Sequence, residues 1–557
     1  MKEKIADLMH KKTGLPKEQI LSLIEIPKDS SLGDYAFPCF SLSILLKKNP
    51  VEIAKEISSD ISSPDFENIQ AVGPYLNFFL DRKHLASSVI QKILKERSKY
   101  GSSTLGKGKT IVIDLSAPNI AKPFGIGHLR STIIGNAISN LAKSLGYKTI
   151  KINYLGDWGT QFGMLIAGYK KWGKEQELKK NPIKHLQDIY VKANVDESME
   201  QEARDWFRKL EAGDKDALKF WKKFRDLSLK EFNKIYSLLN IKFDVLSGES
   251  LYNKKMDATI NLLKSKKLIK KDKGAEVVDL NLYGIGVCLI RKSDGATLYA
   301  TRDITAAIDR YNSYKFDKMI YEVGSEQSLH FKQFFKVLEL AGFKWANNCV
   351  HVAHGLYLDR DGKKFATRKG KTISMSEILD ETIELARREI ENRYQDLSKK
   401  EIESRAKSIA LSAILYGDLK NYRMNDIIFD IERFLSFEGD TGPYLLYTFA
   451  RARNILRKAK YKPSSKIEFS DLSDLEKRIV FALSQFPSVV ENSYMQYSPN
   501  LIANYSFQLA QLFNEFYHKE KVIGAENEHF RLSLVDSFSQ VLKNALSLLN
   551  ISVIERM

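Results

Sequence analysis

Cysteine is scarce in this chain. Three residues among 557, Cys39, Cys288 and Cys349, lie far apart and form no paired spacing. This argues against a disulfide framework and against a cysteine zinc site, as expected in a reducing compartment. No run approaches the roughly 18 apolar residues of a membrane span, and the charged N-terminal segment 1–4 has no apolar signal-peptide region. We therefore expect a cytoplasmic protein with no membrane partner.

Acidic residues are outnumbered. The chain has 87 Lys and Arg against 69 Asp and Glu, which gives a formal net charge of +18. Such a surplus indicates a polyanionic partner or an anionic surface, although a soluble protein from a basic proteome remains the alternative. The hydrophobic fraction, 43%, is ordinary, so the chain can bury cores throughout. Its length suggests three or four domains of about 150 residues each.

Residues 109–159 combine two strand patterns with a helix pattern. Ile111–Leu115 is a β-branched run, broken by the turn-forming residues that follow it. Apolar residues then recur every four positions from Ile133 to Leu145, and 147–154 resumes the alternation of a strand. This pattern predicts a βαβ unit whose Gly/His loop lies at the carboxyl end of a strand, where open α/β sheets bind ligands.

Further strand signals follow at 287–290, 318–323 and 350–352, with helical patterns between them. The alternation predicts a second parallel half of the same sheet. The fold class is therefore α/β, with a doubly wound parallel, Rossmann-type catalytic domain. A long Lys-rich segment at about 165–284 has a helical pattern and is expected as an insertion into that domain.

The remaining regions differ in composition from the sheet domain. Residues 1–100 predict an N-terminal α/β module that ends in the strand-like run 71–80, before a Gly/Ser linker. The Rossmann-type domain is expected over 107–373 and a helical connecting region over 374–434. Strand patterns disappear after about 374, so residues 435–557 predict a C-terminal all-helical domain.

The loop Gly125-Ile126-Gly127-His128 follows the first strand and admits three interpretations. A dinucleotide fingerprint would start directly after the strand, about ten residues earlier, and would have a third glycine where Arg130 stands. A nucleotidyl-transfer loop would use Gly127 for close backbone approach and His128, at a helix N-terminus, as a donor to a phosphate oxygen. A glycine turn with a capping histidine is the structural alternative.

A second loop, 363–371, carries five Lys and Arg residues and a glycine after the last predicted strand. Its position there favours a clamp for pyrophosphate charge, whereas such runs are otherwise solvated surface loops or nucleic-acid patches. His351 and His354 are three positions apart, but no third and fourth zinc ligands are evident. No zinc is therefore expected.

Aromatic and cationic residues interleave in the C-terminal helices. This mixture can stack on splayed bases and neutralise phosphates, as single-stranded RNA loops require. A core-facing aromatic stripe beside a solvated basic face is the alternative. The residues are Tyr444, Tyr447, Phe449, Arg451, Arg453, Arg457, Lys458, Lys460, Tyr461 and Lys462.

Motifs spread in order along most of the chain resemble those of the class I arginyl-tRNA synthetases. They are the run 116–124, Gly-His-Leu-Arg-Ser-Thr at 127–132, Asn-Tyr-Leu-Gly-Asp-Trp-Gly-Thr-Gln-Phe-Gly at 153–163, Leu-Tyr-Ala-Thr-Arg-Asp-Ile at 298–304, Val-Gly-Ser-Glu-Gln at 323–327 with His330-Phe331, Gly-Pro-Tyr-Leu at 442–445 with Tyr447, and Glu-Arg-Met at 555–557.

The resemblance implies an arginine–tRNA ligase that works in two steps. The carboxylate of L-arginine attacks the α-phosphate of ATP, which gives arginyl-adenylate and pyrophosphate. The 3′-terminal ribose of tRNA(Arg) then accepts the aminoacyl group. The partners implied are ATP with Mg²⁺, L-arginine and tRNA(Arg). Residues 435–557 would bind the anticodon and residues 1–100 would contact the tRNA. We expect a monomer.

Matching the family's motifs position by position implies a set of site residues. Asp303 would hold the guanidinium, and Tyr299 and Gln327 would line its site. Asp114, Asn119 and His128 are the candidates beside the rest of the arginine. The implied catalytic residues are Lys122, His128 and Lys369; the ATP-binding residues are Gly125, Gly127, His128, Lys364, Thr367, Arg368 and Lys369; and the tRNA-binding residues are Tyr444, Tyr447, Arg451 and Arg453.

Two signatures depart from the family pattern. Gly125 stands where the first signature histidine is expected, so phosphate stabilisation should rest on His128, backbone N–H groups and Lys122. The second signature is present only as Lys364 to Arg368 with Lys369 next.

Two other classes of protein stay open at this point. A cytidylyltransferase-like nucleotidyl transferase would leave the helical C-terminal domain unexplained, and a synthetase-like tRNA-binding protein would lack activity.

Overall fold

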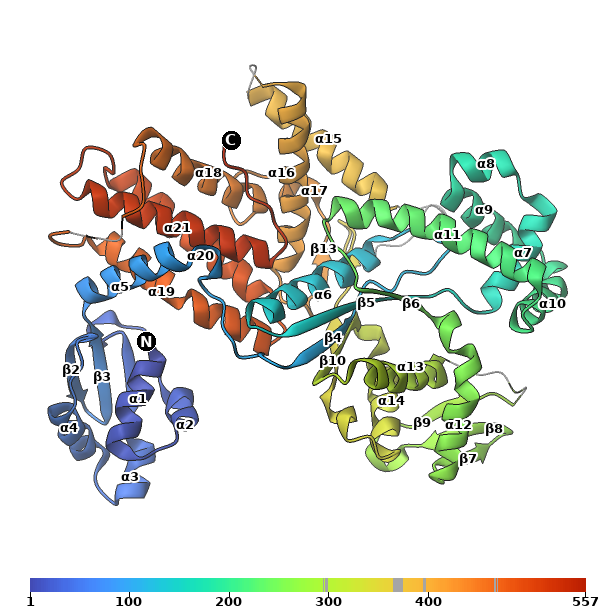
Figure 1. Ribbon diagram of the computed structural model, residues 1–557, viewed down its shortest axis with the longest axis horizontal. Coiled ribbons are helices and arrows are strands. Elements are labelled where there is room, and N and C mark those ends of the chain that lie inside the picture. The colour runs from blue at the N-terminus through green and yellow to red at the C-terminus, as the bar shows by residue number, and fades with distance from the viewer. Residues whose placement is uncertain (294, 296–298, 364–373, 394–396, 465–466, 468) are drawn as a thin grey trace. The chain divides into compact units, whose positions relative to one another are not determined.

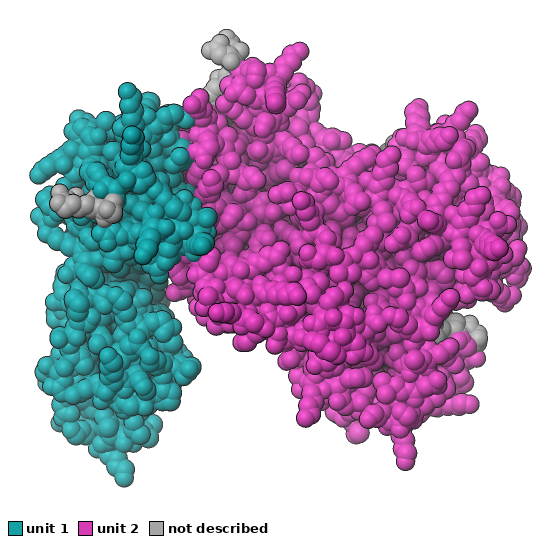
Figure 2. All heavy atoms as spheres, in the orientation of Figure 1, with its two compact units in different colours: residues 1–100, 452–485, 511–541 teal, residues 101–451, 486–510, 542–557 magenta. Residues whose placement is uncertain are grey.

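A computed structural model describes residues 1–557 except 294, 296–298, 364–373, 394–396, 465–466 and 468. The chain forms two compact units, which Figure 2 distinguishes by colour. The smaller unit contains residues 1–100, 452–485 and 511–541, and the larger contains 101–451, 486–510 and 542–557. Among the described residues, no helix is both long enough and apolar enough to cross a bilayer.

A five-stranded parallel sheet organises the larger unit (Figure 1), with strand order β11-β10-β4-β5-β6. Its strands are β4 (Thr110–Asp114), β5 (Lys148–Leu155), β6 (Val245–Gly248), β10 (Lys318–Gly324) and β11 (Cys349–His354). All four pairings are parallel. The chain runs outward on both sides of β4, so the strand order reverses between β4 and β10. The carboxyl edge beside these strands is where doubly wound sheets bind ligands. The predicted fold class is confirmed.

Helices α6 (Ile126–Ser144), α13 (Tyr299–Tyr314) and α14 (Ser328–Leu340) connect or precede these strands. Ile111, Val112 and Ile113 of β4 are fully buried, and Val112 belongs to a core cluster with Met319 and Phe334. A Cβ on Gly135 of α6 would lie 2.6 Å from the Cβ of Leu115. This glycine therefore lets α6 pack closely against the end of β4.

Two features of the larger unit differ from the prediction. β9 (Val287–Arg291) pairs antiparallel with β8 (Ala275–Asp279) in a separate sheet with β7 (Ile269–Asp272), instead of joining the parallel sheet. Its residues alternate between exposed and buried, as in an antiparallel strand with one solvated face. The segment 165–284 is also not helical throughout, because it contains β6, β7 and β8.

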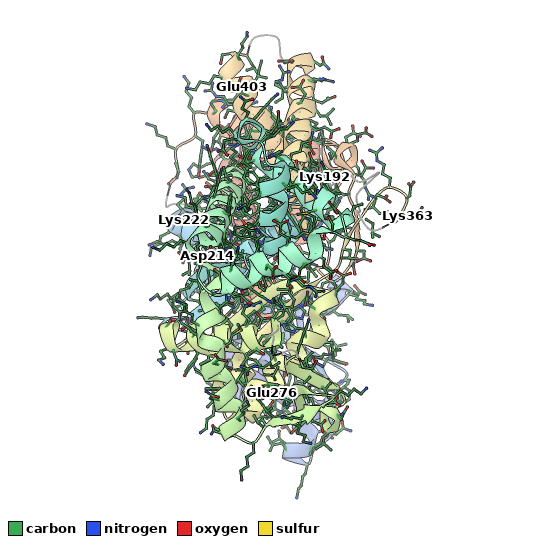
Figure 3. All side chains as sticks on the ribbon, turned by 90° about the vertical axis from the view of Figure 1, so that its right-hand side faces the viewer. Lys192, Asp214, Lys222, Glu276, Lys363 and Glu403 are labelled. Carbon is green, nitrogen blue, oxygen red and sulfur yellow. The ribbon has the colours of Figure 1, made fainter. Side chains whose placement is uncertain are left out.

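The other elements of that segment are helices, and their aromatic side chains pack inward. Trp206 and Phe224 are buried, whereas Figure 3 shows Lys192 and Lys222 as charged side chains on the same helical region. The helices are α7 (Thr160–Trp172), α8 (Glu175–Lys180), α9 (Pro182–Val195), α10 (Met199–Glu211), α11 (Lys215–Leu238) and α12 (Met256–Ser265).

Helices dominate the described residues after 374, as predicted. They are α15 (Met375–Arg393), α16 (Lys399–Leu419), α17 (Ile431–Phe434), α18 (Gly442–Lys458), α19 (Asp474–Met495), α20 (Asn500–Lys519) and α21 (Glu528–Leu548). One short exception is β13 (Ile427–Ile428), which pairs in parallel with β12 (Tyr357–Leu358). Two residues are too few to produce a strand pattern in the sequence.

The N-terminal part of the smaller unit is an α/β module. Its antiparallel sheet has the order β1-β3-β2. The predicted strand 71–80 is divided by a turn, because Gly73 has a φ of +57° and precedes a proline. The elements are α1 (Lys2–Thr13), α2 (Lys17–Leu23), β1 (Tyr35–Pro38), α3 (Phe40–Leu46), α4 (Pro50–Asp60), β2 (Phe66–Val72), β3 (Tyr75–Leu80) and α5 (Arg82–Glu96).

Candidate active site

The carboxyl edge of the parallel sheet gathers most of the site residues predicted from the sequence. Asp114 ends β4, and the Gly-His loop opens α6 after it. Tyr299 and Asp303 lie at the start of α13, and Gln327 ends the 3₁₀ turn η5 (Ser325–Gln327) after β10. The predicted ATP-loop residues lie outside the described part of the chain; they are Lys364, Thr367, Arg368 and Lys369.

The loop between β4 and α6 has a strained backbone. Ser116, Ala117 and Ala121 have φ values of +76°, +45° and +60°, a region that non-glycine residues rarely adopt. Each such residue costs about 1–3 kcal/mol, so the surrounding structure must hold the loop in place. Strain of this kind concentrates at functional sites.

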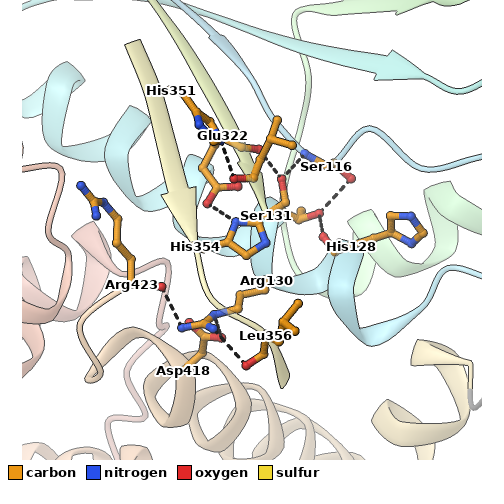
Figure 4. Close-up of polar contacts among 12 residues, drawn as sticks. Ser116, His128, Arg130, Ser131, Glu322, His351, His354, Leu356, Asp418 and Arg423 are labelled. Carbon is orange, nitrogen blue, oxygen red and sulfur yellow. Dashed lines mark hydrogen bonds and ion pairs between the residues drawn. The ribbon is translucent and has the colours of Figure 1, made fainter. Parts of the chain in front are cut away.

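Hydrogen bonds from three elements hold this loop. The hydroxyl of Ser116 lies 2.7 Å from that of Tyr236, and the N–H of Ala121 donates to Ser228 Oγ at 2.8 Å, both partners coming from α11. The N–H of Ser116 donates to Ser131 Oγ at 3.0 Å, and Ser131 donates to the Glu322 carbonyl of β10 (Figure 4). The inserted helix α11 therefore helps to shape the signature loop.

The His128 ring accepts a hydrogen bond in this structure. The N–H of Gly125 donates to its Nδ1 at 3.2 Å, so the neutral ring carries its proton on Nε2. Burial, reinforced by the charge of Lys122, lowers the pKa of His128 to about 4. The ring packs against Phe124, with centroids 5.4 Å apart. An Nε2–H group at a helix N-terminus can donate to an anionic oxygen.

Neither backbone conformation nor packing within the protein requires glycine at positions 125 and 127. Gly125 has a φ of −85°, and a Cβ at Gly127 would meet no atom within 4 Å. Gly127 is exposed, so a ligand can approach its backbone closely. Lys122 is also exposed, and its ammonium lies 5.5 Å from the ring centre of Tyr190 in α9.

Asp303 is paired with an imidazole. Its Oδ2 lies 2.7 Å from Nε2 of His330 in α14, and both side chains are 23% exposed. Tyr299 is 58% exposed, and the guanidinium of Arg302 lies 5.9 Å from its ring centre. Gln327 is exposed. A partly exposed carboxylate one helical turn from an exposed tyrosine suits recognition of a cationic, multiply donating ligand.

Glu249, which the sequence interpretation missed, lies in the same electrostatic neighbourhood. Burial, opposed by the guanidinium of Arg302 at 3.3 Å and reinforced by the charges of Asp303 and Asp157, raises the pKa of Glu249 to about 8. It follows directly after β6. The available signal is an acidic residue after a strand, but the sequence pattern predicts a helical segment there.

Asn119 is held at the end of β5. Its backbone forms an isolated parallel bridge with Gly156, and a Cβ on residue 156 would lie 2.1 Å from Asn119 Oδ1. The amide side chain can therefore lie against the strand end only because residue 156 is glycine.

A buried ion pair anchors the first turns of α6. Arg130 lies 3.3 Å from Asp418 of α16, and donates to the carbonyls of Leu356 and Arg423 at 3.2 Å each (Figure 4). Both charged side chains are almost completely buried. The arginine thus fixes the helix that carries His128 to the segments around β12 and α16.

His351 and His354 have different partners. Nε2 of His351 lies 3.0 Å from the Val323 carbonyl, and Nδ1 of His354 lies 2.8 Å from the Glu322 carboxylate. In the described ranges, no group of three or more His, Cys, Asp and Glu side chains could hold a metal ion. The expectation that the protein binds no zinc stays a prediction.

The predicted tRNA-binding residues lie on α18. In the larger unit, Tyr447 is 38% exposed, and the guanidinium of Arg451 lies 4.9 Å from its ring centre. Tyr444 is half-buried and packs on Phe507. In the smaller unit, Arg453 lies 3.7 Å from Asp536. Tyr447 is the most exposed of the four.

Comparison with known families matches most of the chain. Residues 89–431 match the catalytic domain of class I tRNA synthetases (R), residues 445–557 match the DALR anticodon binding domain, and residues 1–80 match the arginyl tRNA synthetase N terminal domain. The chain belongs to the arginyl-tRNA synthetase family. This membership excludes the cytidylyltransferase-like nucleotidyl transferase, and it accounts for the helical C-terminal region.

Individual relatives support the same family. Arginine–tRNA ligase 2 of Bacillus anthracis is 46% identical over 98% of this chain and 97% of its own length. Arginine–tRNA ligase of Clostridium botulinum is also 46% identical, over 100% of both chains. Among solved structures, the arginyl-tRNA synthetases of Thermus thermophilus and Plasmodium falciparum each match with a TM-score of 0.83, at 24% and 26% identity, over 100% of this chain and 99% of theirs.

Proposed function

We propose that this arginyl-tRNA synthetase family member is an active arginine–tRNA ligase. It activates L-arginine with ATP and transfers the arginyl group to the 3′-terminal ribose of tRNA(Arg). The observation that carries the proposal is the position of Asp303 at the start of α13, on the carboxyl edge of the sheet, where its partner among the described residues is an imidazole. A guanidinium is planar, permanently charged and multiply donating, which suits this acid.

Adenylation needs positioning and charge stabilisation, because the arginine carboxylate itself is the nucleophile. Nε2–H of His128 and the exposed ammonium of Lys122 are proposed to contact the phosphates, while Gly125 and Gly127 admit them to the backbone. The second loop, with Lys364, Thr367, Arg368 and Lys369, is proposed to complete the ATP site. Mg²⁺ would arrive with ATP, since it needs no dedicated protein cage.

The arginine would lie between the two halves of the sheet. Asp303 is proposed to accept from its guanidinium, with Tyr299 and Gln327 beside it. Asn119 and Asp114 are proposed to lie near its ammonium. Because Asp114 already has an internal cation as partner, Asn119 is the better supported of the two.

The tRNA would be held by other parts of the chain. Residues 435–557 are proposed to bind the anticodon through Tyr444, Tyr447, Arg451 and Arg453, and residues 1–100 to contact the tRNA elsewhere. The surplus of 18 positive charges supports a polyanionic partner. We further propose a cytoplasmic monomer, in keeping with three buried cysteines that form no disulfide.

The decisive experiment is aminoacylation of total tRNA with each amino acid in turn. Charging with arginine, dependent on ATP, is expected. Better charging with another amino acid would refute the assigned specificity. Binding of tRNA without any ATP turnover in the presence of arginine would instead support a tRNA-binding protein that has lost activity.

A further inference from the structure

Asp303 differs from three neighbouring acids in the chemistry of its partner, because these three carboxylates lie beside guanidinium groups. The pairs are Asp114 with Arg310 at 2.8 Å, Glu249 with Arg302 at 3.3 Å, and Asp157 with Arg225 at 3.6 Å. The partner recorded for Asp303 among the described residues is the imidazole of His330. Glu322 of β10 also lies beside an imidazole, that of His354, but its side chain is completely buried.

The partner of a carboxylate determines how much of its charge is available to a cationic substrate. An acid paired with an internal guanidinium is already compensated by a permanent charge, so a substrate guanidinium would only replace it. A neutral imidazole instead donates one hydrogen bond and leaves the negative charge for the ligand. In the described structure, the imidazole contacts Oδ2 of Asp303, which leaves Oδ1 on the other side of the carboxylate.

The ring of His330 is held by aromatic packing. Its centroid lies 5.5 Å from that of Phe331 and 5.4 Å from that of Phe334, both on α14. Phe334 in turn packs edge-on against Tyr321 of β10, at 5.5 Å. Asp303 is on α13, so the hydrogen bond joins two helices through residues 27 positions apart in the chain. The imidazole therefore has a fixed direction toward Asp303.

We propose that His330 is a positioning residue for arginine specificity: its Nε2–H orients Asp303 so that the second carboxylate oxygen faces the substrate guanidinium. The inference rests on the proposed function and deepens its substrate site. His330 acts through Asp303 and needs no contact of its own with arginine, ATP or tRNA. Its loss should therefore weaken arginine binding selectively.

The test compares steady-state kinetics of His330→Ala and His330→Gln. Loss of a hydrogen bond to a charged group corresponds to about a tenfold or greater rise in the KM for arginine in His330→Ala. The KM for ATP should stay within about twofold, since no ATP contact is removed. The amide nitrogen of Gln can reach the place of Nε2, so His330→Gln should recover most of the arginine affinity.

His351→Ala is the matched control. His351 stacks on the same Phe331 at 4.2 Å, but its Nε2 lies beside the Val323 carbonyl and not beside Asp303. It should perturb the same aromatic cluster without raising the arginine KM. If His330→Ala does not fold, His330→Phe retains the aromatic packing without the donor and decides the same question.

Asp303→Asn separates failure of this inference from failure of the proposed function. If Asp303→Asn leaves the arginine KM unchanged, the proposed guanidinium site is wrong. If Asp303→Asn raises the arginine KM while His330→Ala and His330→Phe do not, only the role of His330 is refuted. The same holds if the two His330 variants raise the KM for arginine and the KM for ATP equally. In the double variant, removal of His330 should add little beyond Asp303→Asn, because both act through one carboxylate.

Discussion

The carboxylate of Asp114 lies 2.8 Å from the guanidinium of Arg310, and both side chains are buried. The guanidinium also lies 4.9 Å and 5.5 Å from the ring centres of Tyr154 and Tyr321. Burial raises the pKa of Asp114, and the charge of Arg310 opposes this effect. The pair joins the end of β4 to α13, so it ties the strand before the Gly-His loop to the helix that carries Asp303.

Breaking this pair should destabilise the larger unit. Asp114→Asn leaves the Arg310 charge buried without its partner, and we expect a loss of about 3–5 kcal/mol in the free energy of unfolding. Denaturant unfolding of the purified protein measures it. The double variant Asp114→Asn with Arg310→Met should recover part of the loss, since it removes both charges.

A surface pair provides the control for this measurement. Glu231 and Lys234 are 2.7 Å apart on α11, with 30% and 62% of their side chains exposed, so Glu231→Gln should cost less than about 1 kcal/mol. Equal effects of Asp114→Asn and Glu231→Gln would contradict the structural importance of the buried pair.

Asp303→Ala should raise the arginine requirement far more than the ATP requirement. It removes the charged partner of a bound guanidinium, and we expect the KM for arginine to rise by about 100-fold or more. Separate titrations of arginine and ATP in the adenylation assay measure both constants. A similar rise for both substrates would count against the assignment of Asp303 to the arginine site.

The local sequence pattern predicts strands β4, β5, β10 and β11 of the parallel sheet but not β6 at its edge. The buried, β-branched run at 111–115 has the composition of a strand covered on both faces. β6 has only four residues, one of them exposed, and follows the long helix α11, so its sequence does not stand out from a helical segment. Glu249 was missed for the same reason.

The sequence predicts only those site residues that belong to the family's motifs. Asp303 and Gln327 came from the family resemblance, and the structure brings their helices to one edge. The pairing of Asp303 with His330 depends on the packing of α13 against α14, which no local pattern encodes. Likewise, the partners of Arg130 are 226 to 293 positions away along the chain, so its role emerges only from the fold.

The affinity for arginine should increase with pH through Glu249. The pKa of this carboxyl is raised from 4.5 to about 8, so it is mostly protonated at neutral pH and gains its charge as the pH rises through 8. We expect the arginine KM to fall between about pH 6.5 and 8.5, by at most tenfold per pH unit for one group. Glu249→Gln should flatten this dependence in the adenylation assay.

The raised pKa of Glu249 also predicts that stability in the absence of arginine falls as the pH rises. The folded state holds the proton more tightly than the unfolded state, so the contribution of Glu249 to stability declines as the pH rises from 4.5 to about 8. Glu249→Gln should therefore gain in thermal stability relative to the parent at pH 8 but not at pH 4.5. An equal difference at both pH values would contradict the raised pKa.

Tyr447 should contribute to tRNA binding by stacking. The exposed ring on α18, with Arg451 beside it, offers an aromatic face to a splayed base. Tyr447→Ala should weaken tRNA(Arg) binding by about 10- to 100-fold, whereas Tyr447→Phe keeps the ring and should lose little. Filter binding at fixed salt measures both variants. Equal weakening by both would indicate a role for the hydroxyl instead of stacking.

Replacement of His128 should slow adenylation before it affects tRNA binding. Because Nε2–H is proposed to donate to a phosphate oxygen, His128→Ala should reduce the rate of arginyl-adenylate formation by about 100- to 1000-fold. Its affinity for tRNA should stay within about twofold of the parent. His128→Gln, which can place an amide N–H near the position of Nε2, should retain part of the rate.

The pH profile distinguishes this role from general acid catalysis. With its pKa lowered to about 4, His128 is neutral across the range in which the enzyme would be assayed, so its protonation should produce no change in rate above about pH 5. The pH profiles of the parent and of His128→Gln should therefore run parallel above that pH. A limb near pH 6.5 that is present in the parent and absent from His128→Gln would show that the imidazole titrates during the reaction, and it would overturn the neutral-donor role.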